Sequence, residues 1–241
     1  MVKELFIVAF VFVVMPAWAQ KNVTLHAEHI GQVVIDGDLT EWGGKFLPVS
    51  ADKDFSYQVR QDEQNVYIAF LIQNNLLQSM ATLEGISIVL QSKEKGQKDA
   101  MFWFPYADDE VRRALMNEDR DRKNPTALKN ALILRSRGYY VYGFSGVPDG
   151  LLGKVNSYGL VANGKVTDSP SVTYEVVIPK ERWVFADLPV NMKLEIHADR
   201  SALLARRSAG NRRKTTAPIR KSRGKKSKDE PVNKVLLSVE L

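Results

Sequence analysis

The densest group of side chains that could bind a ligand is the aromatic run in "MFWFPYADD", residues 101–109. An aromatic ring offers an apolar surface on which the apolar face of a pyranose can stack, while polar neighbours bond the sugar hydroxyls. In an extended strand, Phe102 and Phe104 share one face and Trp103 points to the other. Trp103 is therefore the predicted exposed ring, and Tyr106 is predicted to line a rim. Burial of all four rings in the core is the alternative.

Two other places carry aromatic residues with the same potential. In "GYYVYGF", Tyr140 and Tyr142 alternate onto one side of a strand, where they form either a ligand platform or one wall of the core. Trp183 follows the strand-like run "VTYEVVIP" and lies next to Arg182. This pair is predicted to form the second wall of a clamp around the ligand.

Motifs for catalysis or metal binding are absent from the sequence. There is no G-x-S-x-G, no H-E-x-x-H and no glycine-rich phosphate loop. His26 and His29 lie three residues apart in a strand-like segment, which places them on opposite faces and disfavours a shared metal. The run "EDRDRKN" lacks the Gly and the terminal Glu of a calcium loop. We therefore expect a non-enzymatic protein without a cofactor, since calcium and haem have only weak support.

Positive charge is concentrated in one segment. The net charge is +6, yet residues 206–228 contain eleven Lys or Arg and no acid, which leaves −5 for the rest. With few apolar residues, a stretch of this composition does not pack into a core. It is predicted to be a flexible basic loop, about 204–230, between two strands. The candidate contacts to an anionic partner are Arg212, Arg213, Lys214, Arg220, Lys221, Arg223, Lys225 and Lys226.

That basic loop supports an alternative function. Its charge would attract an acidic polysaccharide, lipopolysaccharide, an anionic surface or an acidic protein. Because no aromatic residue lies between Arg206 and Lys228, base stacking is absent and nucleic-acid recognition is disfavoured. A solvated loop that serves only solubility remains open.

The first 19 residues have the pattern of a secretory signal peptide. Lys3 precedes an apolar run from Leu5 to Met15, and "AWA" at 17–19 supplies a small-x-small cleavage site. The apolar run is too short to span a bilayer, and no later segment is apolar enough. We expect export to the periplasm, the cell surface or the medium. The chain has no cysteine, so it forms no disulfide.

Short apolar or alternating runs dominate the rest of the chain. Strands are predicted for "FSYQVR", "NVYIAFLIQ", "GISIVLQ", "YYVYGFSG", "VTYEVVIP", "MKLEIHA" and "KVLLSVEL", separated by turns rich in Gly, Pro, Asn and Asp such as "ANGKVTDSP". This pattern predicts an all-β fold, a two-sheet antiparallel sandwich of the jelly-roll type. A helix is predicted near 107–120, while "PTALKNALILRSR" suits either a helix or a strand. We expect one domain, 20–241, with a helical insertion at about 107–135.

Four motifs in order resemble the carbohydrate-binding module family 9-like domains, relatives of the DOMON-type sandwiches. They are "VIDGDLTEW", the hairpin "VRQDEQNVYIAFLIQNN", "LEGISIVLQ" and "VTYEVVIPKERW". The resemblance implies a jelly-roll-like sandwich that binds sugar without catalysis, and some DOMON-type domains bind haem through Met and His. Asp36, Gly37, Trp42 and Glu175 are then expected to mark the fold rather than a site.

The sequence departs from that family at two positions. Gln91 stands where an acid commonly ends the "EIFLD" strand, and Asn74 stands where an aspartate commonly follows the hairpin. No ligand contact is therefore carried over from the family. The sequence predicts an exported saccharide-binding module that uses aromatic stacking, with the anionic partner as the alternative. It contains no signal for the oligomeric state.

Overall fold

The computed structural model describes residues 23–26, 28–29, 33–91, 98–106, 109–118, 125–169, 171–182, 190–197 and 233–240. Three sequence predictions lie outside these residues: the signal peptide, Trp183 and the basic loop with its candidate cations. Among the helices of the described residues, none is long and apolar enough to cross a membrane.

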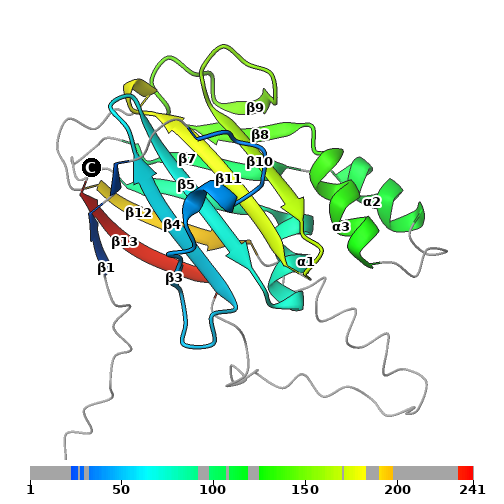
Figure 1. Ribbon diagram of the computed structural model, residues 1–241. Coiled ribbons are helices and arrows are strands. Elements are labelled where there is room, and N and C mark those ends of the chain that lie inside the picture. Colours follow the sequence, from blue (N-terminus) through cyan, green and yellow to red (C-terminus); the bar gives the residue numbers. More distant parts are fainter. Residues whose placement is uncertain are drawn as a thin grey trace, which may run out of the picture.

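Two β-sheets stack face to face in the described chain (Figure 1). Their strand orders are β1-β13-β12-β6-β7-β8-β9 and β10-β11-β5-β4-β2, with β3 also paired to β4. Neighbouring strands are antiparallel except for the parallel pairs β1–β13 and β2–β4.

The seven-stranded sheet consists of β1 (Val23–His26), β6 (Ile86–Gln91), β7 (Ala100–Tyr106), β8 (Gly138–Tyr142), β9 (Gly150–Gly153), β12 (Val190–Ile196) and β13 (Lys234–Glu240). The six-stranded sheet consists of β2 (Glu28–His29), β3 (Leu47–Pro48), β4 (Phe55–Gln61), β5 (Asn65–Ile72), β10 (Val161–Val166) and β11 (Val172–Pro179).

The core lies between the sheets and is built by period-two alternation. On β7, Phe102 and Phe104 are buried and face strands of the other sheet, where Phe70 and Tyr174 are equally buried. Ring contacts cross the core, as between Phe104 and Tyr174, whose centroids lie 5.9 Å apart. Burial of this apolar area supplies the main free energy of folding. The prediction of a two-sheet β-sandwich is confirmed.

Within the described ranges the sheets are accompanied by three α-helices: α1 (Asn75–Glu84), α2 (Asp109–Glu118) and α3 (Pro125–Leu134). The last two group at one end of the sandwich (Figure 1) and occupy the predicted insertion. The alternative strand in "ALILRS" is wrong, because α3 continues through those residues to Leu134. The sequence analysis did not predict α1. Its signals are local: Asn74 caps it, and Gly85, with φ +80°, ends it.

Strand β10 corrects a second prediction, since "ANGKV" was assigned to a turn. Gly164 lies inside this strand, opposite Tyr174 of β11. A Cβ at position 164 would lie 2.5 Å from the Tyr174 ring, so the glycine allows the ring to cross the strand. The residue that suggested a turn is therefore required by close packing.

The outer face of the six-stranded sheet is covered by the chain before β4. In Figure 1 this segment, drawn in blue with the short 3₁₀ helix η1 (Thr40–Trp42), crosses that sheet. Val33 and Trp42 pack against Tyr67, Ala69 and Val177. Every residue of β4 is buried, because both of its faces are covered.

Candidate functional site

Four of the predicted ligand-binding residues lie on the outer face of the seven-stranded sheet. Trp103 of β7 is paired in register with Tyr140 of β8, and Met101 is paired with Tyr142. Because Phe102, Tyr139 and Val141 enter the core, these alternating neighbours must point outward. We call the group of Trp103, Tyr106, Tyr140 and Tyr142 the aromatic face.

Three of its rings contact one another. The Trp103 centroid lies 5.3 Å from that of Tyr106 and 6.2 Å from that of Tyr140, and both tyrosines meet the indole edge-on. The centroids of Tyr106 and Tyr140 are 5.4 Å apart. Among the described residues, the hydroxyls of Tyr106, Tyr140 and Tyr142 have no hydrogen-bond partner. The fourth ring, Tyr142, has the Lys98 ammonium 5.4 Å from its centroid.

Trp103 is half-buried and fixed in place, which corrects the prediction of a simply exposed ring. Its indole Nε1 donates to the Glu84 carbonyl at 2.7 Å, and one ring face stacks on His197 at 4.5 Å. Gly85 makes this approach possible, because a Cβ there would lie 2.3 Å from Nε1. The alternative of four core rings is wrong for Trp103 and Tyr106, and right for Phe102 and Phe104.

Polar side chains lie beside these rings. Arg112 of α2 donates to the Glu84 carboxylate at 2.7 Å. Lys193 and Glu195 of β12 form an ion pair on the same outer face. Burial lowers the pKa of His197, so its imidazole is neutral at neutral pH, and its Nε2 has no partner among the described residues.

Sequence reasoning missed His197, Glu84 and Glu195 as neighbours of the aromatic face. For His197 a signal existed: in "MKLEIHA" it alternates with the buried Leu194 and Ile196, so it faces outward. The position of Glu84 depends on α1, a helix that was not predicted.

The structure separates Arg182 from the aromatic face. It lies in a pocket of about 540 Å³ at one end of the sandwich, lined by residues 63–65, 157–159 and 179–182. We call this the end pocket. Arg182 itself contacts Tyr158, Glu181 and the backbone of Ser145. The second wall of the clamp was predicted from Arg182 together with Trp183, which lies outside the described residues, so the clamp stays a prediction.

The expected fold-marker residues meet at a buried carboxylate. Glu175 is fully buried and accepts from Trp42 Nε1 at 2.6 Å, from the Gly37 amide at 2.6 Å and from the Asp36 amide at 3.0 Å. Burial raises the pKa of Glu175 to about 7. A perturbed acid is a candidate catalytic group, but this one is sealed beneath Trp42, which is also fully buried. Its contacts hold the covering segment onto the sheet.

In the described residues, no group of three His, Asp or Glu side chains is placed so that it could hold a metal ion. The side chains of His26 and His29 are outside the description. The carboxylates of Glu84, Glu195 and Glu181 are each paired with a cation.

Comparison with known proteins gives a similarity among solved structures but none among family models or curated proteins. No protein-family model matches the sequence, and no curated protein is similar to it. Among solved structures, the chain is similar to a carbohydrate-binding module of family 9 from Caldicellulosiruptor kristjanssonii in complex with glucose. The two share 10% identity over 74% of this chain and 81% of that one, with a TM-score of 0.36. This similarity assigns neither a ligand nor a residue role to the chain.

Proposed function

We propose that this protein binds saccharides, without cleaving them, on the aromatic face of its seven-stranded sheet. The observation that carries the proposal is the fixed cluster of Trp103, Tyr106 and Tyr140, whose ring centroids lie 5.3 to 6.2 Å apart on an outer sheet surface. Rings placed in advance lose little conformational entropy when a ligand binds.

Sugar chemistry fits this surface in two ways. The C–H face of a pyranose is apolar and packs on an aromatic ring, which removes apolar area from water. The equatorial hydroxyls then require hydrogen-bond partners in the plane of the ring. Donors and acceptors are available there from two sources. One is the set of tyrosine hydroxyls without a partner among the described residues, those of Tyr106, Tyr140 and Tyr142, and the other is the nearby Lys193–Glu195 pair.

The state of the described acids near the site supports binding without catalysis. Glycoside hydrolysis needs two carboxylates flanking the scissile bond. Beside the aromatic face, Glu84 is paired with Arg112 and Glu195 with Lys193. The acid with the raised pKa, Glu175, lies under the opposite sheet surface. We infer further that the chain is exported, because residues 1–19 have a signal-peptide pattern and glycans are abundant outside the cell.

A glycan array with residues 20–241 tests the proposal, at about 0.05 and 0.5 M salt. Stacking on a neutral sugar should persist at high salt, since screening weakens only ionic contacts. Trp103→Ala and Tyr140→Ala should each lower the affinity about tenfold or more. Tyr140→Phe keeps the ring and separates stacking from the hydroxyl contact. Leu47→Ala, a change at an exposed apolar residue of the other sheet, is the control and should bind normally.

Two results would contradict the proposal. Neutral glycans that bind Trp103→Ala and Tyr140→Ala as well as the wild type would place the site elsewhere. Binding of acidic glycans alone, lost at 0.5 M salt, would favour the alternative function of the basic segment 206–228, since charge-driven binding weakens as salt rises.

A further inference from the structure

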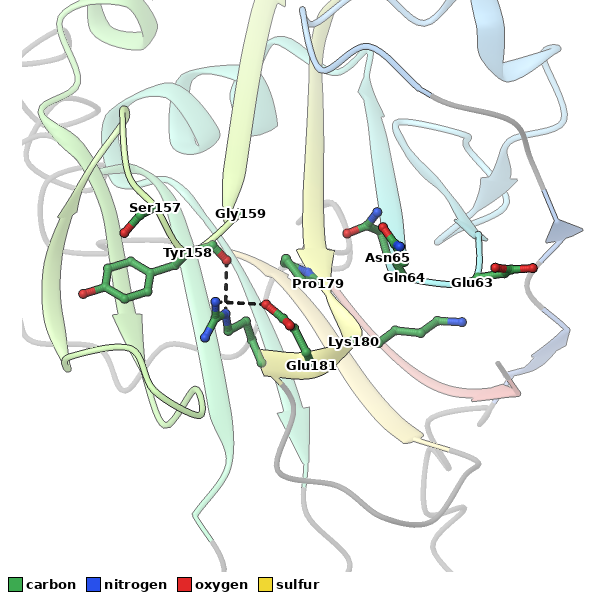
Figure 2. Close-up of a pocket in the computed structure, with 10 residues that line it drawn as sticks. Glu63, Gln64, Asn65, Ser157, Tyr158, Gly159, Pro179, Lys180 and Glu181 are labelled. Carbon is green, nitrogen blue, oxygen red and sulfur yellow. Dashed lines mark hydrogen bonds and ion pairs between the residues drawn. The ribbon is translucent and has the colours of Figure 1, made fainter.

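The end pocket is separate from the aromatic face and comes from three connections of the fold. They are the turn between β4 and β5, the stretch before β10, and the exit of β11. Figure 2 shows Ser157 and Tyr158 on one side of Pro179, and Glu63, Gln64 and Asn65 on the other. The volume of about 540 Å³ lies within the range of small-molecule sites.

Hydrogen bonds between these connections form the pocket before any ligand arrives. The Lys180 amide donates to the Gln64 carbonyl at 2.7 Å, and Lys180 Nζ donates to Gln61 Oε1 at 2.8 Å and the Asp62 carbonyl at 2.7 Å. On the other side, Arg182 Nε donates to the Tyr158 carbonyl at 3.3 Å, and the guanidinium lies over the Tyr158 ring. All three connections are thereby tied together.

The rim of the pocket nevertheless carries polar groups that this framework does not use. Among the described residues, the Glu63 carboxylate, the side-chain carboxamide of Gln64 and the hydroxyls of Ser157 and Tyr158 have no hydrogen-bond partner. Such groups usually bond water or a ligand. They include donors and acceptors of both kinds, arranged around an aromatic residue.

The charge of the lining narrows the ligand class. Two carboxylates, Glu63 and Glu181, balance two cations, Lys180 and Arg182, so the pocket has no net formal charge. A strongly anionic or cationic ligand would meet a like charge within the same pocket. A polyhydroxyl ligand has no such conflict, because each hydroxyl can donate to a carboxylate or accept from an ammonium or guanidinium.

We propose that the end pocket is a second saccharide site, which takes one neutral sugar unit. The ligand class rests on the proposed function, whereas the site itself is independent of the aromatic face. Both sites border the same loop: Tyr142 ends β8, and three residues later the Ser145 amide donates to the Arg182 carbonyl at 2.9 Å. Those three residues span at most about 11 Å. One glycan chain that occupies both sites would bind more tightly than a single unit, through effective concentration.

The test is an NMR titration of the full exported chain, residues 20–241, with neutral tetrasaccharides of glucose, xylose, galactose and N-acetylglucosamine. The Trp103 indole N–H reports the aromatic face, and the backbone amides of 157–159 and 180–182 report the end pocket. The buried Trp42 indole N–H serves as the internal reference that should not move. We expect both sets of reporters to shift with at least one of the sugars.

Variants separate the two sites. Tyr140→Ala, which keeps the Trp103 reporter, should remove the ligand-induced shift of the Trp103 indole N–H and leave those of the end pocket. The double variant Gln64→Ala, Ser157→Ala removes exposed rim groups outside the tying hydrogen bonds, and should weaken the pocket response about fivefold or more while the Trp103 response stays unchanged. Asn117→Ala, an exposed polar-to-alanine change on α2, is the matched control and should alter neither.

Each outcome decides between the proposals. Shifts at Trp103 alone would overturn the end pocket and leave the proposed function standing. Shifts at the end pocket alone would support it and move the saccharide site away from the aromatic face. If no reporter shifts with any of the four sugars, the saccharide function fails and the end-pocket proposal fails with it.

Discussion

The outer face of each sheet carries a hydrogen-bonded tryptophan, but one is fully buried and the other is half-buried. On each, a tryptophan donates its indole N–H to a fixed oxygen: Trp42 to the Glu175 carboxylate at 2.6 Å, and Trp103 to the Glu84 carbonyl at 2.7 Å. Trp42 is fully buried in the segment that covers the six-stranded sheet. Trp103 is half-buried and shares an outer surface with Tyr106 and Tyr140.

The difference lies in what each ring stabilises. The Trp42 contacts attach a segment of the chain to a sheet, so the ring contributes to folding. The contacts of Trp103 with Glu84 and His197 fix its orientation, while the hydroxyls of Tyr106 and Tyr140 have no hydrogen-bond partner in the described part of the chain. Trp42 therefore acts mainly through stability, whereas the role that we propose for Trp103 is ligand binding.

The largest expected effect is on folding. Trp42→Ala should lower the free energy of unfolding by about 3 to 5 kcal/mol, because it empties a buried site and removes the donor to Glu175 Oε1. Trp103→Ala, at a half-buried position, should cost about 1 to 2 kcal/mol. Urea unfolding measures both. Equal costs for the two variants would contradict the assignment of different roles.

The second expected effect is a pH dependence of stability that comes from Glu175 on the covered face. The pKa of Glu175 rises from 4.5 to about 7 on folding, so the folded state favours the protonated acid. Its contribution is complete below about pH 4.5 and is lost as the pH rises through 7, a change of about 3 kcal/mol. Relative to Glu175→Gln, the wild type should lose about that much stability between pH 4.5 and 8. Parallel stability curves for the two proteins would refute this.

A smaller effect is expected at the glycine beneath Trp103. Gly85→Ala places a Cβ 2.3 Å from Trp103 Nε1 at a φ of +80°, so it should displace the indole and cost about 2 kcal/mol. Saccharide affinity should fall about tenfold. Gly44→Ala is the matched control: its φ is +73°, but nothing lies within 4 Å of the added Cβ. The control should cost about 1 kcal/mol and bind normally. Normal binding by Gly85→Ala would show that the position of Trp103 is unimportant.

The smallest effect concerns the helix that carries Glu84. Asn74 Oδ1 accepts from the amides of Leu76 and Leu77, so Asn74→Ala should cost about 1 kcal/mol. Asn74→Asp keeps this cap but places a carboxylate opposite Asp54, whose Oδ2 now accepts from Asn74 Nδ2 at 3.0 Å. It should therefore cost less than Asn74→Ala at pH 3 and more at pH 8, as thermal unfolding would show. Equal stability of the two variants at both pH values would contradict the contact with Asp54.

Local pattern was enough to predict most of the fold. Alternation along β7 placed Phe102 in the core and Trp103 outside, because a strand's period depends only on its own backbone. At position 74, where the resemblance led us to look for an aspartate, Asn74 Nδ2 donates to Asp54 Oδ2 at 3.0 Å, a bond that an ionised aspartate could not donate. The turn assigned to "ANGKV" failed for a tertiary reason, the passage of Tyr174 over Gly164.

The candidate site was harder to predict because it depends on contacts between distant segments. Trp103 and Tyr140 were identified separately, and only the register of β7 with β8 pairs them. Arg182 was assigned to the same ligand because it is charged and near an aromatic residue in sequence. Its place in the end pocket depends on how the exit of β11 packs against the β4–β5 turn and the stretch before β10. No pattern in the sequence indicates that packing.

The parallel pairing of β1 with β13 has a consequence for the order of folding. The last strand of the chain is inserted between β1 and β12, so residues 23–26 have no partner in the sheet until residues 234–240 arrive. Contacts between segments this far apart in sequence form slowly, because the entropy of closing the intervening loop is lost before the contacts can stabilise the fold. A chain cut before β13 would leave β12 as an open sheet edge, whose unpaired amides and carbonyls favour aggregation. Docking of β13 thus determines whether the edge of β12 is paired within the sandwich or left open to aggregation.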